Sequence, residues 1–266
     1  MTSAHGPASD AAERVDTDAA SPWYAEHRSR YLFATERVAG RSVLDIACGT
    51  GYGARVLHDA GAKLVVGVDN SLEPLRVARQ REGVRCLLRG EASGIPLRSN
   101  AVDVVTCFES VEHVQADEKF VAELRRVLKP DGALLLSTPN ALHTKPVNGV
   151  PSNPYHVREY SPRELTTLLE RHFQSVEMLG QAPSPCYGFC PYWQRPENLP
   201  TDFKSRLGVL SWKAFGRLPQ GLRDALEWLF RRRAYYPSEK DFTFDAALVD
   251  AGHVLLAVCS GSRNGD

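Results

Sequence analysis

The stretch Val43-Leu-Asp-Ile-Ala-Cys-Gly-Thr-Gly-Tyr-Gly53 decides the fold, together with Val66-Gly-Val-Asp69 downstream. An apolar strand ends near Asp45 and continues into a loop with glycines at positions 49, 51 and 53. Glycines let the backbone turn sharply and approach a ligand closely. A second apolar strand ends in Asp69, where a carboxylate accepts hydrogen bonds from a ribose diol. The stretch therefore predicts a binding site for an adenosine-containing cofactor.

Two classes of cofactor fit this spacing. The run Gly49-Thr-Gly-Tyr-Gly-Ala54 satisfies the loose dinucleotide fingerprint, with Asp69 as its ribose acid. However, Asp45 at the exit of the first strand would repel a pyrophosphate, and residues 47–54 contain no Lys or Arg to offset it. These features favour S-adenosylmethionine over a dinucleotide.

On these residues the chain resembles the class I S-adenosylmethionine-dependent methyltransferases, in the large group that includes the ubiquinone-pathway O-methyltransferases. The resemblance covers roughly residues 40–180. It departs at Ala47, where that family usually has its first glycine, and we expect a small residue to be tolerated there. The resemblance implies a doubly wound α/β fold with a seven-stranded, mostly parallel sheet.

The rest of the sequence alternates apolar strands with amphipathic helices, which is typical of a parallel sheet covered on both faces. Strands are predicted at 42–47, 64–69, 84–88, 102–108, 132–138, 174–180 and 252–259. Helices are predicted at 23–38, 52–60, 72–82, 116–128 and 162–171. Ser161-Pro162 with Glu164 predicts a capping box at the start of the last helix.

This pattern divides the chain into three parts. Residues 1–22 read as a disordered tail, and residues 23–180 with 250–262 form the predicted cofactor-binding core. Residues 181–249 break the alternation and are rich in aromatic residues and proline. Since a connection of this length exceeds the usual loop range, we expect a largely helical insertion before the last strand. It is either a lid that recognises substrate or a dimerisation element.

Composition narrows the partners. The formal net charge is zero, whereas a nucleic-acid partner usually leaves a basic excess, so none is expected. No apolar run approaches the length of about 20 residues that a membrane span needs, and the N-terminal stretch lacks the apolar segment of a secretion signal. The six cysteines show no metal-binding spacing and read as reduced thiols, which indicates a cytoplasmic protein.

Acids and imidazoles cluster after the fourth predicted strand. Glu109, Glu112 and His113 share one face if they form the first turn of a helix. His156 follows the fifth strand, a neighbour of the fourth, and so reaches the same cleft. The pattern is similar to the metal site of small-RNA 2′-O-methyltransferases and ubiquinone-pathway O-methyltransferases. By that resemblance these four residues bind Mg²⁺ or a similar divalent ion, which lowers the pKa of the hydroxyl to be methylated.

Other roles for this group stay open. His113 is alternatively a general base that works without a metal, with His156 and Glu112 as further catalytic residues. Glutamates in a first helical turn are also favoured by the helix dipole alone, which would make the group structural.

The resemblance also assigns the cofactor contacts. Asp45 and Phe108 lie near the methionine ammonium, Ala47, Gly49 and Gly51 pass close to the methionine part, and Arg28 pairs with its carboxylate. Asp69 and Asn70 meet the ribose, whereas Glu91 and Ala92 meet the adenine. An alternative for Asp69 is a purely turn-capping role.

Together these features predict an S-adenosylmethionine-dependent O-methyltransferase that acts on a small polyhydroxylated molecule, such as a sugar or a glycosylated natural product. The substrate class follows from Ser137-Thr-Pro-Asn140 and Asn153-Pro-Tyr-His-Val-Arg-Glu-Tyr160, which are similar to methyltransferases acting on sugars. Two alternatives remain: metal-independent N-methylation of an aminosugar, and a non-catalytic partner of another methyltransferase. A homodimer is compatible with the sequence.

Overall fold

A computed structural model describes residues 22–81, 83–183, 203, 207, 210–211, 214–215, 217–230 and 238–262. The predicted tail, Cys186, Cys190 and the larger part of the aromatic insertion lie outside the described residues. Among the described residues, none of the helices has the length and apolarity that crossing a bilayer requires.

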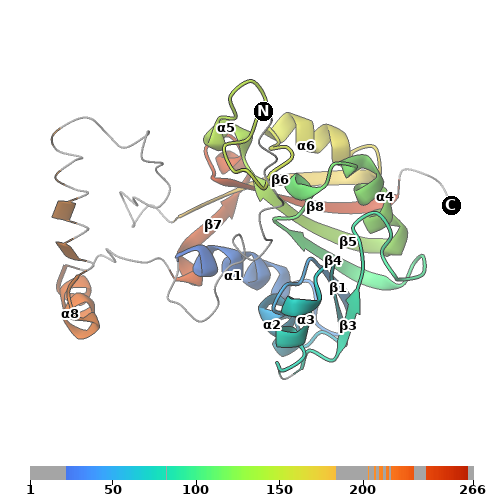
Figure 1. The fold of residues 1–266 in the computed structure, drawn as a ribbon, viewed down its shortest axis with the longest axis horizontal. Coiled ribbons are helices and arrows are strands. Elements are labelled where there is room, and N and C mark those ends of the chain that lie inside the picture. Colours follow the sequence, from blue (N-terminus) through green and yellow to red (C-terminus); the bar gives the residue numbers. More distant parts are fainter. Residues whose placement is uncertain are drawn as a thin grey trace, which may run out of the picture.

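The described chain forms one mixed sheet flanked by helices (Figure 1). The strands are β1 (Ser42–Ile46), β2 (Leu64–Asp69), β3 (Cys86–Arg89), β4 (Val102–Phe108), β5 (Leu128–Pro139), β6 (Phe173–Pro183), β7 (Phe242–Asp245) and β8 (Val254–Ser262). The helices are α1 (Pro22–Thr35), α2 (Tyr52–Asp59), α3 (Leu72–Ala78), α4 (Asp117–Val127), α5 (Ala141–Thr144), α6 (Pro162–Leu169) and α8 (Gln220–Phe230). Short 3₁₀ turns are η2 (Val111–His113), η6 (Glu239–Asp241) and η7 (Ala246–Leu248).

The strand order is β3-β2-β1-β4-β5-β8-β6-β7. The pairs β1–β2, β1–β4, β2–β3 and β4–β5 are parallel, whereas β8 pairs antiparallel with both β5 and β6. From β1 the chain continues to β2 and β3 on one side of the sheet, and it then crosses to β4 and β5 on the other side. The topological switch point therefore lies between β1 and β4. Ligands of open α/β sheets bind at the carboxyl ends of the strands at such a point.

Apolar side chains fill both faces of the sheet. On one face, Phe120 and Leu124 of α4 and Leu165 of α6 pack against the strands. On the other face, Tyr31 of α1 and Leu57 of α2 do so. Figure 1 shows α4 and α6 on one side of the sheet and α1, α2 and α3 on the other. The predicted doubly wound α/β class is therefore confirmed, with eight strands instead of seven.

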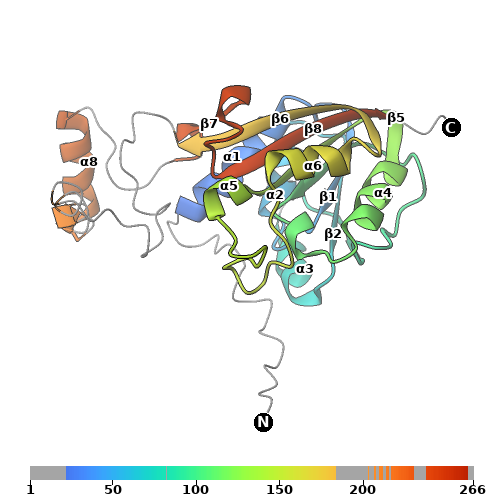
Figure 2. The same ribbon diagram turned by 90° about the horizontal axis from the view of Figure 1, so that it is seen from above.

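The additional strand, β7, comes from within the predicted insertion. It pairs antiparallel with β6, from Gly180↔Asp245 to Pro183↔Phe242. Figures 1 and 2 place it beside α1, and the rings of Phe33 in α1 and Phe244 in β7 lie 4.9 Å apart. A second difference is β5, which begins at Leu128 instead of the predicted residue 132, and its ladder with β4 carries a register shift between Val102 and Val104.

Candidate active site

The carboxylate of Asp45 lies at the end of β1 and is fully buried, at 0% exposure. Its Oδ1 accepts hydrogen bonds from the Tyr31 hydroxyl (3.0 Å) and the Thr106 hydroxyl (2.8 Å). Its Oδ2 has no hydrogen-bond partner among the residues that the structure describes. Burial raises the pKa of Asp45 to about 7, because the charged form is poorly solvated there. Asp45 therefore offers a buried acceptor that a cationic group would stabilise.

The glycine-rich loop after β1 turns through left-handed backbone conformations. Ala47, Gly49 and Gly51 have φ values of 56°, 51° and 75°. At Gly51 a Cβ atom would lie 2.8 Å from the Cβ of Ala78 in α3, so this position needs glycine for space as well as for conformation. Ala47 adopts the conformation in spite of its Cβ, and this is the position where the resemblance expects glycine.

Asp69 ends β2 and contacts the same loop. Its Oδ2 accepts a hydrogen bond from the Gly49 N–H, and its Oδ1 accepts one from the Ser71 N–H, each at 2.9 Å. The carboxylate thus caps the turn, as the alternative interpretation expects. Each carboxylate oxygen can accept a second hydrogen bond, so a ribose role for Asp69 stays a prediction. Asn70 follows at the surface, where its backbone carbonyl accepts a hydrogen bond from Arg89.

The two residues predicted at the adenine differ in burial. Glu91 is exposed and its backbone bridges to Gly94, whereas Ala92 packs against the hydrophobic core.

The remaining predicted cofactor residues lie near α1. The ring of Phe108 lies 4.9 Å from that of Tyr31, and its carbonyl accepts a hydrogen bond from the Ser110 hydroxyl at 3.1 Å. Arg28 forms an ion pair with Glu239 of η6, with 3.5 Å between Nε and Oε1. Its pairing with the methionine carboxylate stays a prediction.

The structure brings together three of the four predicted metal ligands. Glu112, His113 and His156 each offer a ligand atom, and these atoms lie within 4.8 Å of one another. Glu112 is 1% exposed, and its Oε2 accepts a hydrogen bond from the Thr138 hydroxyl at 3.0 Å. Within the described part of the chain, its Oε1 has no hydrogen-bond partner, and it lies 3.9 Å from Nε2 of His113. Burial raises the pKa of Glu112 well above its usual range, and the nearby charge of Glu109 adds to the rise.

Hydrogen bonds orient the two imidazoles. Nδ1 of His113 lies 3.0 Å from the Tyr155 carbonyl, which only accepts, so we assign the proton to Nδ1 and the lone pair to Nε2. Nδ1 of His156 lies 3.0 Å from Oε1 of Glu159. Its Nε2 lies 2.9 Å from Nδ2 of Asn153, which is an amide donor. A carboxylate behind an imidazole is the usual support of a metal-ligating histidine, but here Asn153 occupies the other ring nitrogen.

Glu109 lies apart from this cluster. The condition for a shared helical face at residues 109–113 is not met, because Glu109 has a φ of 51° and the 3₁₀ turn η2 begins only at Val111. Oε1 of Glu109 accepts a hydrogen bond from the Ser137 hydroxyl at 2.7 Å and lies 3.8 Å from Nη2 of Arg30. Glu109, Glu112 and His113 therefore do not share a helical face.

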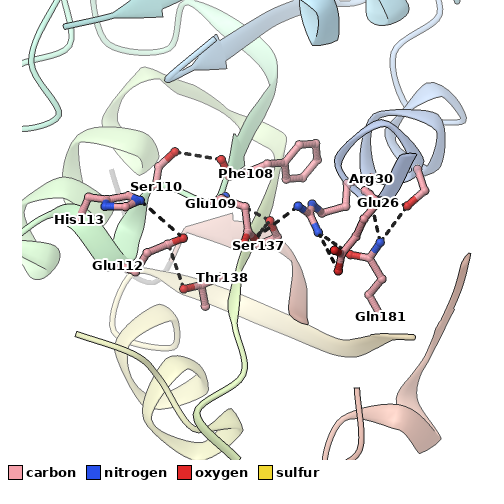
Figure 3. A network of polar contacts seen from close by, with 11 residues as sticks. Glu26, Arg30, Phe108, Glu109, Ser110, Glu112, His113, Ser137, Thr138 and Gln181 are labelled. Atoms are coloured by element: carbon pink, nitrogen blue, oxygen red, sulfur yellow. Dashed lines mark hydrogen bonds and ion pairs between the residues drawn. The ribbon is translucent and has the colours of Figure 1, made fainter. Parts of the chain in front are cut away.

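Sequence reasoning missed the buried polar group that α1 contributes (Figure 3). Arg30 is 1% exposed, and its Nη1 donates to Oε1 of Gln181 in β6 at 2.7 Å. The same guanidinium lies 3.8 Å from Oε1 of Glu26. Burial raises the pKa of Glu26 to about 7. The i, i+4 spacing of Glu26 and Arg30 could have indicated their ion pair. The contact of Arg30 with Gln181 could not be predicted in this way, because Gln181 is distant in the sequence.

Comparison with known proteins shows which class of protein the chain is similar to. Residues 44–136 match the family described as a methyltransferase domain. Over 155 residues the chain is 39% identical to a probable S-adenosylmethionine-dependent methyltransferase of Mycolicibacterium smegmatis, covering 58% of this chain and 60% of the relative. Over this region the chain is therefore similar to S-adenosylmethionine-dependent methyltransferases. The chain spans less than two thirds of the length of such curated relatives.

Two further comparisons are more distant. The chain is 37% identical over 110 residues to the ubiquinone biosynthesis O-methyltransferase of Haemophilus ducreyi, covering 38% of this chain and 46% of the relative. A Thermotoga maritima structure, described as a methyltransferase and possible histamine N-methyltransferase, superposes with a TM-score of 0.55 at 19% identity, covering 91% of this chain and 93% of that one. At that identity the structural likeness shows the fold alone.

Proposed function

We propose that the chain transfers a methyl group from S-adenosylmethionine to a hydroxyl of a small polyhydroxylated molecule, such as a sugar or a glycosylated natural product. The observation that carries the proposal is the cluster of Glu112, His113 and His156 within 4.8 Å beyond β4 and β5. It lies at the carboxyl edge of the sheet, as the glycine loop beyond β1 does. A donor at that loop would place its methyl group beside groups that can activate a hydroxyl.

The residues around the glycine loop fit the methyl donor. S-Adenosylmethionine supplies a methyl group on a positively charged sulfonium. The unpartnered Oδ2 of Asp45 suits a buried ammonium group, directly or through a water, and the Phe108 carbonyl is a second acceptor nearby. Asp69 at the end of β2 would take the ribose hydroxyls.

The cluster also suits a divalent ion. Among the described residues Oε1 of Glu112 has no hydrogen-bond partner, Nε2 of His113 lies 3.9 Å from it, and His156 is supported by Glu159. These three residues would hold Mg²⁺ or a similar ion, and the ion would lower the pKa of a bound hydroxyl. A sugar hydroxyl needs such help, because it is a poor nucleophile at neutral pH.

One observation favours a second candidate, catalysis by histidine without a metal. Nδ2 of Asn153 lies 2.9 Å from Nε2 of His156, so metal binding through that nitrogen requires Asn153 to move. In this alternative Nε2 of His113 accepts the proton of the acceptor, and the buried Glu112, 3.9 Å away, stabilises the imidazolium that forms.

Binding and activity measurements test the proposal in turn. Calorimetry with S-adenosylhomocysteine tests the donor site, and methylation of a panel of polyols and aminosugars tests the acceptor class. EDTA treatment and Glu112→Gln should each abolish turnover of hydroxyl acceptors. The control variant Glu170→Gln, at the exposed residue that follows α6, should keep its turnover. Activity that survives EDTA but falls in Glu112→Gln would refute metal assistance and favour histidine catalysis. Full activity after both treatments would favour N-methylation. Donor binding without turnover of any acceptor favours the non-catalytic alternative.

A further inference from the structure

Glu109 is held in place by contacts on both its backbone and its side chain. Its φ of 51° is a left-handed conformation that a residue with a Cβ adopts only when its surroundings compensate. Its N–H donates to the Ser137 carbonyl at 3.1 Å, and its Oε1 accepts from the Ser137 hydroxyl at 2.7 Å. Arg30 supplies the positive charge, with Nη2 3.8 Å from the same Oε1.

Arg30 is itself fixed from the opposite side. Its Nη1 donates to Oε1 of Gln181, and Nε2 of Gln181 donates to the Ser29 hydroxyl at 2.8 Å and the Glu26 carbonyl at 3.1 Å. Figure 3 shows Arg30 and Gln181 on one side of Glu109, with Glu112 and His113 on the other. A buried guanidinium anchored in this way defines where a carboxylate can lie to be paired with it.

We propose that Arg30 is a positioning residue that holds Glu109 on the α1 side of β4 and thereby limits the ligand set of the cation site to Glu112, His113 and His156. The inference rests on the metal assistance proposed above. It departs from the four-residue set that the sequence implies, because Glu109 is partnered by Arg30 and Ser137 in this chain.

The physical basis is a competition for one carboxylate. While Arg30 is present, the ion pair and the Ser137 hydrogen bond hold Glu109 by its Oε1, so a dication that attracts this carboxylate competes with both contacts. Without Arg30, the carboxylate of Glu109, which is 17% exposed, loses the cation beside it, so a nearby divalent ion becomes its best partner. Loss of Arg30 should therefore strengthen metal binding. An Arg30 with only a structural role would weaken metal binding when it is removed.

The first measurement needs no metal. Urea unfolding of wild type, Arg30→Met, Glu109→Gln and the double variant gives the coupling between the two side chains. We expect the effect of Glu109→Gln on the unfolding equilibrium constant to be about fivefold smaller when Arg30 is already replaced. Additive effects of the two substitutions would overturn the inference. If Arg30→Met does not fold, Arg30→Gln takes its place, because it also removes the charge but keeps a polar side chain.

The second measurement is Mn²⁺ binding in the presence of S-adenosylhomocysteine. Glu109→Gln should leave the affinity unchanged, Arg30→Met should raise it about tenfold, and the double variant should return to the wild-type value. Arg30→Lys should behave as wild type. Arg158→Met controls for removal of one positive charge near the cluster, since Arg158 is half exposed and pairs with Asp117 and Glu164 instead.

Three results count against the inference in distinguishable ways. A large loss of Mn²⁺ affinity in Glu109→Gln would show that Glu109 is a ligand in spite of Arg30. An unchanged or weakened affinity in Arg30→Met would also overturn the positioning role alone. If none of the variants binds Mn²⁺, the metal assistance fails together with this inference, while binding of S-adenosylhomocysteine still reports on the donor site.

Discussion

The carboxyl group of Asp45 couples ligand binding to pH. Burial raises its pKa from 3.8 to about 7, so its contribution to folding stability is complete below about pH 4 and is lost as the pH rises toward 7. A cationic group beside Oδ2 favours the ionised form and releases the proton. We therefore expect the affinity for S-adenosylhomocysteine to rise between pH 5.5 and 7.5, by at most about tenfold per pH unit.

Calorimetry across this pH range measures the effect. Asp45→Asn should bind more weakly and lose the slope, whereas Asp131→Asn, at an exposed position in β5, should keep it. A slope that survives in Asp45→Asn would assign the pH dependence to another group.

Ala47 carries backbone strain that glycine would relieve. Its φ is 56°, and its side chain is exposed. A Cβ in this left-handed region costs about 1–2 kcal/mol, and part of the gain from removing it is lost to the greater freedom of glycine in the unfolded chain. We expect Ala47→Gly to raise the free energy of unfolding by about 0.5–1 kcal/mol in urea titrations. Ala122→Gly, inside α4, should instead lower it by about 1 kcal/mol.

At the scale of elements, Gly53 sets the distance between α2 and α1. A Cβ at this position would lie 2.0 Å from the Tyr31 ring, which itself contacts Phe108 and donates a hydrogen bond to Asp45. Gly53→Ala must displace a buried ring, so we expect a loss of about 1–3 kcal/mol in unfolding free energy and weaker binding of S-adenosylhomocysteine. Gly94→Ala, where a Cβ meets no atom within 4 Å, should change neither. Equal stability of both variants would contradict this packing role.

Elements that follow from local pattern could be predicted from the sequence. The strands at 64–69 and 102–108 coincide with β2 and β4, because each is a buried apolar run that ends at a polar site. The capping box of Ser161 and Glu164 is confirmed by both of its hydrogen bonds. By contrast, β7 is four residues long at the edge of the sheet, and only its pairing with β6 defines it.

The site was predictable to the same extent. The positions of Asp45 and Asp69 could be predicted, because both lie at the ends of strands that the apolar pattern of the sequence indicates. The conformation of Glu109 was not predictable, since acidic residues in that position usually begin a helix. It depends on Arg30 and Ser137, which come from other elements and are distant in the chain.

At the scale of the whole molecule, the long connection between β6 and β7 begins and ends at neighbouring points. Pro183 and Phe242 are register partners, so the two ends of the excursion meet at the edge of the sheet. The returning chain then contacts α1, through the ion pair of Arg28 with Glu239 and the rings of Phe33 and Phe244. The excursion is thus attached to the core beside the helix that contributes Tyr31 and Arg30 to the site.

Because the two ends of the connection are neighbours, it can be shortened without disrupting the pairing of β6 with β7. In the variant to be tested, a short Gly-Ser linker replaces residues 184–236. We expect this variant to keep β7 and η6 and to bind S-adenosylhomocysteine with an affinity within about threefold of the wild type, because the predicted donor-binding residues lie elsewhere. If the connection recognises the acceptor, turnover should fall by at least about a hundredfold while donor binding persists, since binding energy from the rest of the acceptor supports the reaction. Calorimetry, turnover and light scattering on the same sample separate the two roles. Undiminished turnover with loss of a dimer would assign the connection to assembly instead, and loss of donor binding would show that it completes the cofactor site.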